Sequence, residues 1–413
     1  MPKSRLDSWK SIAEYLERSP RTVQRWHACH GLPVHHFGGC KGSVFAYAEE
    51  IDRWLLSLAE QGQDVEDGEA DSLAVRKRQS KALTTRAAEM WETHSEDSLN
   101  FIAGLFRKAI DQDPGNSRAF IGLADAMLVA GLQGMMDSAV AYSCAMEALR
   151  RSQPTDEDAE TDATCSAAWL NLVYERKWRQ ARAKFEDVLE KQPESAFALA
   201  GMALIHVAEG DLRVASTWAW EAWRNNTLIG SLGALVCWIQ YLSGDWSQAL
   251  ELVGQVQSSG GRSLTLAVVE ALALLQAGPS LENLQRIESR AADFGQNSIL
   301  QGVLGYAYGV SDKTEKAWGI FHVLEQLNSQ KKKNCAYGMA LVSLGLGKRQ
   351  DATRWLEASY TEGSLWSLGF RSDPVLADLR DDPRYDLLVR KIGNLPGAGS
   401  QTAPSFDYLA KAI

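Results

Sequence analysis

The chain has 413 residues, of which 45% are hydrophobic and 23% are charged, a composition typical of a soluble globular protein. Its formal net charge of −9 argues against a protein that coats nucleic acid along its whole length. The densest apolar run, residues 232–242, is shorter than the roughly 18 residues of a membrane span. The first residues lack the apolar core of a signal peptide, and six scattered cysteines form no disulfide framework. We therefore expect a cytoplasmic protein that makes no membrane contact.

An amphipathic helix is predicted near the start of the chain. Its apolar stripe has the spacing i, i+3, i+4 and i+7 and consists of Trp9, Ile12, Ala13 and Leu16. Asp7 or Ser8 supplies the side-chain oxygen that caps its N-terminus. Glu17 and Arg18 then form a tight turn.

Ser19 and Pro20 are predicted to open a second helix, because serine caps free N–H groups and proline fits the first helical position. Val23 and Trp26 should face the first helix, which leaves a polar set facing outward. Arginine and glutamine make bidentate hydrogen bonds to guanine and adenine edges, and threonine suits a phosphate or a thymine methyl group. The residues assigned to base edges are Arg21, Gln24 and Arg25; those assigned to phosphates are Arg18, Thr22 and Lys41.

A β-hairpin and a third helix are predicted to follow. Residues 33–37 and 43–47 alternate in polarity and are separated by glycines, which is typical of a hairpin. His35, His36 and Lys41 should point outward, where they suit a DNA backbone or minor-groove contact. The third helix opens with acidic residues, which its N-terminal dipole favours. Its buried stripe is Ile51, Trp54, Leu55 and Leu58.

This order of elements resembles the winged helix-turn-helix of the MerR and excisionase type. The resemblance is carried by SWKSIAEYLERSPRTVQRW, GLPVHHF, GSVFAY and IDRWL, and it departs at Glu17, where such motifs usually place glycine. It implies a winged helix-turn-helix domain over residues 1–59 that binds double-stranded DNA. Residues 1–47 carry seven Lys and Arg against three Asp and Glu, a net charge of +4, so positive charge collects where phosphates would lie. This modest excess predicts weak binding by a monomer and a need for a homodimer.

Two other interpretations of this region stay open. The helix-turn-helix elements suit a module that docks on proteins and has no role with nucleic acid. Imidazole and thiolate groups are zinc ligands, and six of them lie within fourteen positions. Their spacing fits no standard zinc pattern, so we expect no metal and no other cofactor. These residues are His27, Cys29, His30, His35, His36 and Cys40.

Residues 60–81 are predicted to form a flexible linker. The stretch EQGQDVEDGEAD is rich in glycine and acid and has no apolar period. The basic cluster that follows, Arg76, Lys77, Arg78 and Lys81, is expected to start the next helix as a solvated face.

From residue 82 onward the sequence repeats itself. A small residue that opens the second helix of each unit recurs with a period of 34 residues, at Ala181, Ala215, Ala249 and, two periods later, Ala317. Prolines should end the second helices, since proline cannot continue a helix. These prolines are Pro114, Pro154 and Pro193. Large residues should fill the space between neighbouring hairpins, namely Phe106, Phe185 and Phe321. Asn283 stands where the small residue is due, so that repeat is expected to pack loosely.

A helix–turn–helix unit of 34 residues resembles the tetratricopeptide repeat, in which stacked hairpins bury each other's apolar faces. We therefore predict a mainly α protein, in which a small winged helix-turn-helix domain precedes an α-solenoid. The array should cover residues 82–360, with capping helices over 361–395 and a mobile tail over 396–413.

The resemblance also implies a concave groove that holds a protein or peptide partner. Its lining would be aromatic and apolar, which suits an extended peptide or a small ligand. The alternative is that these side chains only pack a tightly wound superhelix. They are Tyr174, Leu204, Trp238, Tyr241, Leu272 and Tyr306.

We find no motif of a phosphate-binding loop, a zinc protease or a serine hydrolase, so we expect no enzyme and no catalytic residue. The favoured function is a sequence-specific DNA-binding regulator of bacterial type, whose array binds a partner or effector or pairs two chains. The alternative is a protein-interaction scaffold in which the N-terminal motif is a docking module.

Overall fold

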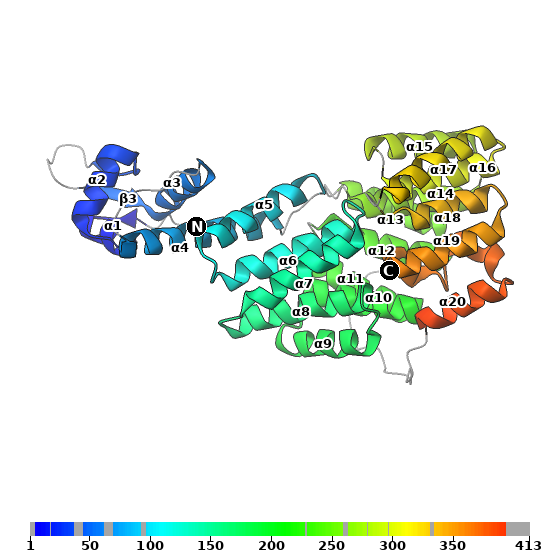
Figure 1. Cartoon of the computed structure of the whole chain (residues 1–413), viewed down its shortest axis with the longest axis horizontal. Coiled ribbons are helices and arrows are strands. Elements are labelled where there is room, and N and C mark those ends of the chain that lie inside the picture. The colour runs from blue at the N-terminus through cyan, green and yellow to red at the C-terminus, as the bar shows by residue number, and fades with distance from the viewer. Residues whose placement is uncertain are drawn as a thin grey trace. The chain divides into compact units, whose positions relative to one another are not determined.

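The structure is a computed structural model, and the elements it describes are almost all helices, as the predicted mainly α class requires. It describes residues 5–16, 18–36, 44–61, 69–91, 96–227, 229–258, 263–278, 280–295, 297–330 and 334–393. The chain divides into two compact units. The first unit comprises residues 1–91, 100–123 and 151–153, and the second unit comprises residues 92–99, 124–150 and 154–413. Figure 1 labels helices α1 to α20 and strand β3.

The N-terminal part of the first unit holds three helices and a small sheet. They are β1 (Arg5–Leu6), α1 (Trp9–Tyr15), α2 (Pro20–His30), β2 (His35–His36), β3 (Val44–Tyr47) and α3 (Ala48–Gln61). The strands pair antiparallel in the order β1-β3-β2, so the predicted hairpin forms between β2 and β3. Strand β1 was not predicted, because two residues are too short to show an alternating pattern. The hairpin turn and Glu17 lie outside the described residues.

The core of this part is built from the predicted stripes. Ile12 of α1, Val23 and Trp26 of α2 and Ile51 of α3 have no exposed surface, and Leu55 has almost none. Trp54 is only partly buried, and its indole N–H donates to the His30 carbonyl at 2.8 Å. Burial of these large side chains fixes the orientation of α2 against α1 and α3.

Helix α4 (Glu69–Trp91) corrects the predicted linker, since residues 69–81 are helical. Val75, Gln79, Leu83 and Ala87 form one buried ridge along this helix, with the spacing i, i+4, i+8 and i+12. The acidic, glycine-rich composition of residues 60–71 is the reason that the sequence predicts a linker there. Residues 62–68 lie outside the described part of the chain.

The basic cluster of α4 is only partly the solvated face that we predicted. Arg76, Lys77 and Lys81 are exposed. Arg78, in contrast, places its guanidinium 3.9 Å from the centre of the Tyr15 ring, and Val75 belongs to the core of α1 to α3. The start of α4 is therefore packed against the N-terminal elements.

The remaining helices follow one another with short connections. They are α5 (Glu96–Gln112), α6 (Ser117–Leu132), α7 (Ser138–Ser152), α8 (Glu157–Val173), α9 (Trp178–Lys191), α10 (Ala196–Glu209), α11 (Leu212–Asn225), α12 (Gly230–Leu242), α13 (Trp246–Ser258), α14 (Leu264–Gln276), α15 (Leu281–Asp293), α16 (Ser298–Val310), α17 (Thr314–Ser329), α18 (Ala336–Gly345) and α19 (Arg349–Thr361). In the second unit, α8 to α19 pair as hairpins, and the first helices of neighbouring hairpins pack on each other. This part of the fold is a solenoid of helical hairpins.

The predicted landmarks of the repeat fall where they were expected. Ala181, Ala215, Ala249 and Ala317 are each fully buried and are each the fourth residue of their helix. Ala352 holds the same fourth position in α19, although it is one residue out of phase in the sequence. The three prolines each follow the end of a helix by two residues. The alanine methyl group at the fourth position of the second helix lets the two helices of a hairpin approach closely.

The prediction for the large aromatic residues is correct for two of three. A Cβ atom on Gly122 would lie 2.2 Å from the Phe106 ring, and a Cβ on Gly201 would lie 2.2 Å from the Phe185 ring. In each pair, a bare glycine backbone makes room for the ring. The prediction for Phe321 is wrong: this side chain is half-buried and contacts Trp318 on its own helix.

The chain ends in three short helices, η1 (Leu365–Gly369), η2 (Pro374–Leu379) and α20 (Pro383–Gly393). Their positions agree with the predicted capping helices, and Asp373 and Pro374 start η2 as expected. The predicted mobile tail lies outside the described residues. No helix in the described part of the chain is long and apolar enough to cross a membrane.

Candidate functional sites

Helix α2 is the first candidate site, and its local sequence fixes both of its ends. The Ser19 side chain accepts from the Thr22 N–H at 3.1 Å, Pro20 occupies the first turn, and Gly31 closes the helix in the left-handed conformation with φ of 69°. Val23 and Trp26 face the core, as predicted. The opposite face of the helix is therefore held toward solvent.

The solvent-facing side of α2 carries Arg21, Gln24 and Arg25, all exposed. Their spacing of i, i+3 and i+4 places the two guanidinium groups and the carboxamide on one side of the helix. No aspartate or glutamate occurs in α2, so its own sequence does not neutralise these cations. Such a face can donate forked hydrogen bonds to base edges or to phosphates.

Two of the residues predicted to contact phosphates already interact with other side chains of the protein. Thr22 is half-buried, and its hydroxyl pairs with the Ser19 hydroxyl at 2.9 Å. Arg18 is only 9% exposed, and its guanidinium lies 5.7 Å from the Trp26 ring centre. We correct the role of Arg18 accordingly: it packs over Trp26 in a cation–π contact and does not face a phosphate. The third predicted contact, Lys41, lies outside the described residues.

The histidines of strand β2 are exposed, as predicted. His35 is nevertheless engaged, since its Nε2 atom lies 2.5 Å from a Glu50 carboxylate oxygen and its ring stacks on Phe45. The His36 ring lies 5.8 Å from that of His27. On the exposed edge of β2, His36 is therefore more available than His35 for a contact with another molecule.

The described histidines and cysteines of the predicted cluster each have other surroundings. Nδ1 of His27 is 2.8 Å from the Leu32 carbonyl oxygen, which ties this ring to the end of α2. Across the described residues, no three His, Cys, Asp or Glu side chains are placed to hold a metal ion. Cys40 lies outside those residues, so the structure does not place the whole cluster.

The second candidate site is the inner face, by which we mean the surface of α10, α12 and α14 that packs against the C-terminal segment 365–379. Four residues predicted to line an open groove are at most 2% exposed, and the other two are half-buried. The four are Leu204, Trp238, Tyr241 and Leu272; the two are Tyr174 and Tyr306. The predicted open groove is therefore corrected, and the alternative that these side chains form a core is the one the structure favours.

Aromatic packing explains how the inner face is filled. The Trp366 ring of η1 meets Trp238 edge-on at 5.1 Å between centres, and Tyr337 lies parallel to Trp366 at 6.0 Å. Gly369 lets the Trp238 ring approach, because a Cβ atom there would lie 2.7 Å from it. The segment thus supplies the apolar partner that a peptide would otherwise supply.

A buried carboxylate fixes the polar part of the same segment. Asp373 is 1% exposed, accepts from the Tyr241 hydroxyl at 2.7 Å and from the Tyr337 hydroxyl at 3.2 Å, and caps η2 through the Val375 N–H. Burial raises the pKa of Asp373 to about 6, although the tyrosine hydrogen bonds oppose this shift. Three hydrogen bonds compensate the loss of water around this group.

Arg176 holds the other end of the segment. Its guanidinium donates to the Tyr360 carbonyl at 3.2 Å and to the Ser367 hydroxyl at 3.0 Å. The same group lies 4.8 Å from the Tyr360 ring centre, and burial lowers the pKa of Arg176 to about 10. The turn between α8 and α9 is thereby joined to the last turn of α19 and to η1.

Neither the role of Asp373 nor that of Arg176 was predicted from the sequence. The stretch SLWSLGF, with two aromatic residues four apart beside a glycine, was the available signal of a buried segment. Its contact surface lies more than a hundred residues away in the chain, since Tyr241 and Asp373 are 132 positions apart. Short-range patterns do not identify such a partner.

No protein-family model matches the chain, and no curated protein matches it. Solved structures with similar folds include a tetratricopeptide repeat protein from Parabacteroides merdae, with a TM-score of 0.38, 10% identity and coverage of 76% of this chain and 99% of that one. The APC/C hetero-tetramer Cut9-Hcn1 gives a TM-score of 0.45 at 12% identity, with coverage of 83% and 82%. The human IFIT1 dimer with PPP-AAAA gives 0.40 at 15% identity, with coverage of 76% and 80%. Scores and identities this low carry no argument about this chain.

Proposed function

We propose that this protein binds double-stranded DNA in a sequence-specific way through α2 and acts as a transcriptional regulator. The observation that carries the proposal is the exposed set Arg21, Gln24 and Arg25 on a helix whose other face is locked into a core. A rigid helix with outward arginine and glutamine side chains fits the major groove of duplex DNA. In this proposal residues 1–59 form the winged helix-turn-helix domain, with β2 and β3 as its wing.

The helical array, in this proposal, receives a protein partner or pairs two chains. Its hairpins resemble tetratricopeptide units in length and in the buried small residue of each second helix. The inner face holds the chain's own segment, so partner contacts are assigned to the outer surfaces of the array. Residues 1–47 carry a net charge of only +4, which predicts weak DNA binding by one chain. A homodimer would add a second DNA contact.

A second candidate function is a protein-interaction scaffold whose N-terminal elements are a docking module. The solenoid of hairpins, which makes up most of the second unit, favours this candidate, because such arrays offer long side-chain surfaces to partners. The two candidates differ in what α2 touches: duplex DNA in the first, a protein surface in the second.

Titration of the full-length protein with fluorescent random-sequence duplex at several salt concentrations tests the proposal. DNA binding predicts an affinity that falls steeply with salt, and a loss of affinity in the double variant Arg21→Ala, Arg25→Ala. The double variant Arg76→Ala, Lys77→Ala is the matched control, because it removes two exposed cations from α4 in the same unit. No binding at low salt, or an equal loss in the control, would favour the scaffold.

A further inference from the structure

The hairpin of α14 and α15 is built differently from its neighbours. These two helices pack less closely than the helices of the other hairpins between α8 and α19. The sequence signals the cause, since Asn283 occupies the place of the small residue. Helix α15 starts one residue later than the period requires, so that Leu284 becomes its fourth residue. The expected loose packing of this repeat is confirmed.

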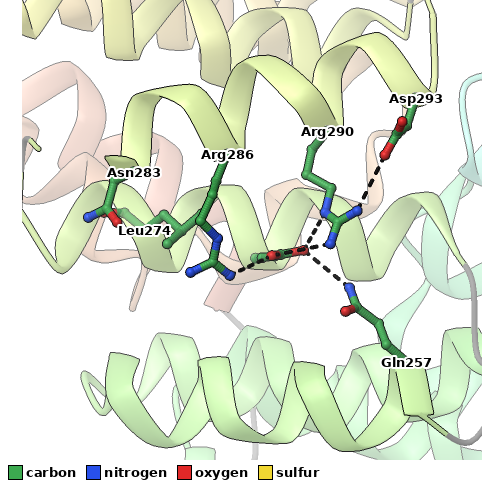
Figure 2. A network of polar contacts seen from close by, with 7 residues as sticks. Gln257, Leu274, Asn283, Arg286, Arg290 and Asp293 are labelled. Atoms are coloured by element: carbon green, nitrogen blue, oxygen red, sulfur yellow. Dashed lines mark hydrogen bonds and ion pairs between the residues drawn. The ribbon is translucent and has the colours of Figure 1, made fainter. Parts of the chain in front are cut away.

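Side-chain hydrogen bonds and ion pairs join α15 to α14. Figure 2 shows Asn283, Arg286 and Arg290 of α15 directed toward α14. The Glu270 carboxylate on α14 is 2% exposed and accepts from Arg286 at 2.8 Å and from Arg290 at 2.7 Å. These hydrogen bonds hold the pKa of Glu270 below its usual value, against the effect of burial.

At the loop end of this hairpin, a half-open cavity of about 200 Å³ lies between α14, α15 and α16. Its apolar wall includes Leu274, Leu284, Ile287 and Ala307, and its polar wall includes Asn283 and Tyr306. No charged side chain lines it among the residues that the structure describes. A cavity of about 150 Å³ with apolar walls is already large enough for a benzene molecule.

Asn283 gives the cavity a specific polar group. Its Nδ2 atom donates to the Gly278 carbonyl at 2.9 Å and to the Leu274 carbonyl at 3.2 Å, which uses both amide protons. Its Oδ1 atom accepts no hydrogen bond from the described residues. A bound molecule with one O–H or N–H group would donate to this oxygen in place of water.

We propose that this cavity binds a small neutral molecule with one aromatic or cyclic apolar body and one hydrogen-bond donor. The volume admits a single ring and is below that of sites for drug-sized ligands. The uncharged walls exclude carboxylates and ammonium groups, because an unpaired ion loses its hydration on entering such a site. The site lies on the array and is separate from the helix assigned to DNA.

The test measures binding of three probes to the full-length protein by calorimetry or ligand-observed NMR. Benzyl alcohol, benzoate and benzylammonium share one ring and differ in charge. We expect benzyl alcohol to bind at least about tenfold more tightly than either ion, equivalent to about 1.4 kcal/mol. No binding of benzyl alcohol, or equal binding of the three probes, overturns the proposal.

A pair of variants locates the site. Val310 lines the cavity and is 45% exposed, so the indole of Val310→Trp can cover the opening without strain in the core. Val323 on α17 is 43% exposed and does not line the cavity, which makes Val323→Trp the matched control. We expect at least about tenfold weaker binding in Val310→Trp and no change in Val323→Trp. Equal affinities in the two variants, each with an unchanged melting temperature, overturn the assignment.

A fourth probe separates a small molecule from a peptide side chain. N-acetyl-phenylalanine amide carries the same ring on a peptide backbone. The proposal predicts that it binds more weakly than benzyl alcohol, because the cavity has no room for the backbone. Tighter binding that Val310→Trp abolishes would make the cavity a peptide anchor and overturn the small-molecule assignment.

Discussion

The solvent-facing side of α2 and the inner face of the array were both predicted to be binding surfaces. Only the first of them is exposed to solvent. Arg21, Gln24 and Arg25 face solvent, whereas Trp238 and Tyr241 are buried beneath segment 365–379. The difference depends on whether another segment of the same chain can pack on each surface. Aromatic side chains are stabilised by any apolar partner, including a segment of the same molecule. Charged side chains lose hydration on burial, so the arginines of α2 stay at the surface.

The largest expected effect comes from removing the segment's central ring. Trp366→Ala deletes a side chain that is 4% exposed and should destabilise the protein by about 3–5 kcal/mol, because a cavity opens against Trp238. Trp318→Ala on α17 is the control, since that ring is half-buried and should cost about 1 kcal/mol or less. Urea denaturation measures both. Similar losses in the two variants would show that the inner face is not filled as described.

The buried carboxylate of Asp373 predicts an unusual pH dependence. Its pKa is raised from 3.8 to about 6, so the folded state binds this proton more tightly than the unfolded chain does. Stability should therefore increase as the pH falls through 6 toward 4, by about 2–3 kcal/mol in total, of which about 1 kcal/mol or less is gained between pH 8 and pH 5.5. Carboxylates with a lowered pKa, such as Glu270, lose their contribution only at more acidic pH.

The variant Asp373→Asn sharpens this test. It removes the titrating group and keeps one oxygen that accepts from a tyrosine hydroxyl, while the amide nitrogen takes the place of the other oxygen and can donate to the second hydroxyl. We expect a urea midpoint that varies less between pH 8 and pH 5.5 than that of the parent protein. If the stability of the parent protein instead increased from pH 5.5 to pH 8, the raised pKa of Asp373 would be contradicted.

A smaller effect is expected at the open surface. Arg25→Ala should weaken binding to a selected DNA site by about 1–3 kcal/mol and relax the preference at one base position. The fold should be unaffected, because the side chain is exposed. Site selection from random oligonucleotides, followed by titration on matched and mismatched duplexes, measures this. Equal loss on every sequence would place Arg25 on the DNA backbone.

The smallest effect compares the N-terminal caps of two helices. Ser19→Ala removes the cap of α2 and Ser8→Ala removes the cap of α1, each at a cost of about 1 kcal/mol. Only Ser19→Ala should also weaken DNA binding, since it loosens the helix that carries the exposed arginines. If both variants weakened DNA binding equally, binding would depend on overall stability and not on the position of α2.

Local sequence predicted most of the first unit and most of the repeat. Ser19, Val23 and Trp26 define a capped amphipathic helix without outside information, and the buried alanine of each hairpin follows from a constant period. The start of helix α4 was missed because the acidic, glycine-rich stretch at residues 60–71 shows no apolar period.

The filling of the inner face was beyond local patterns. An aromatic residue such as Trp238 has the same sequence signature whether it lines a groove or a core. Trp238 lies in a core because Trp366 and Asp373 pack on the inner face. Both residues come far along the chain, after the last repeat. The loose α14–α15 hairpin, in contrast, was visible at Asn283, because the departure there breaks a period that the neighbouring units keep.

Hydrogen exchange of the full-length protein, with and without a selected duplex, tests the contrast between the open helix and the filled inner face most directly. The account predicts that DNA slows exchange in α2, while segment 365–379 exchanges slowly in both states because it is already buried. Fast exchange in segment 365–379, together with no change in α2 on addition of DNA, would contradict it.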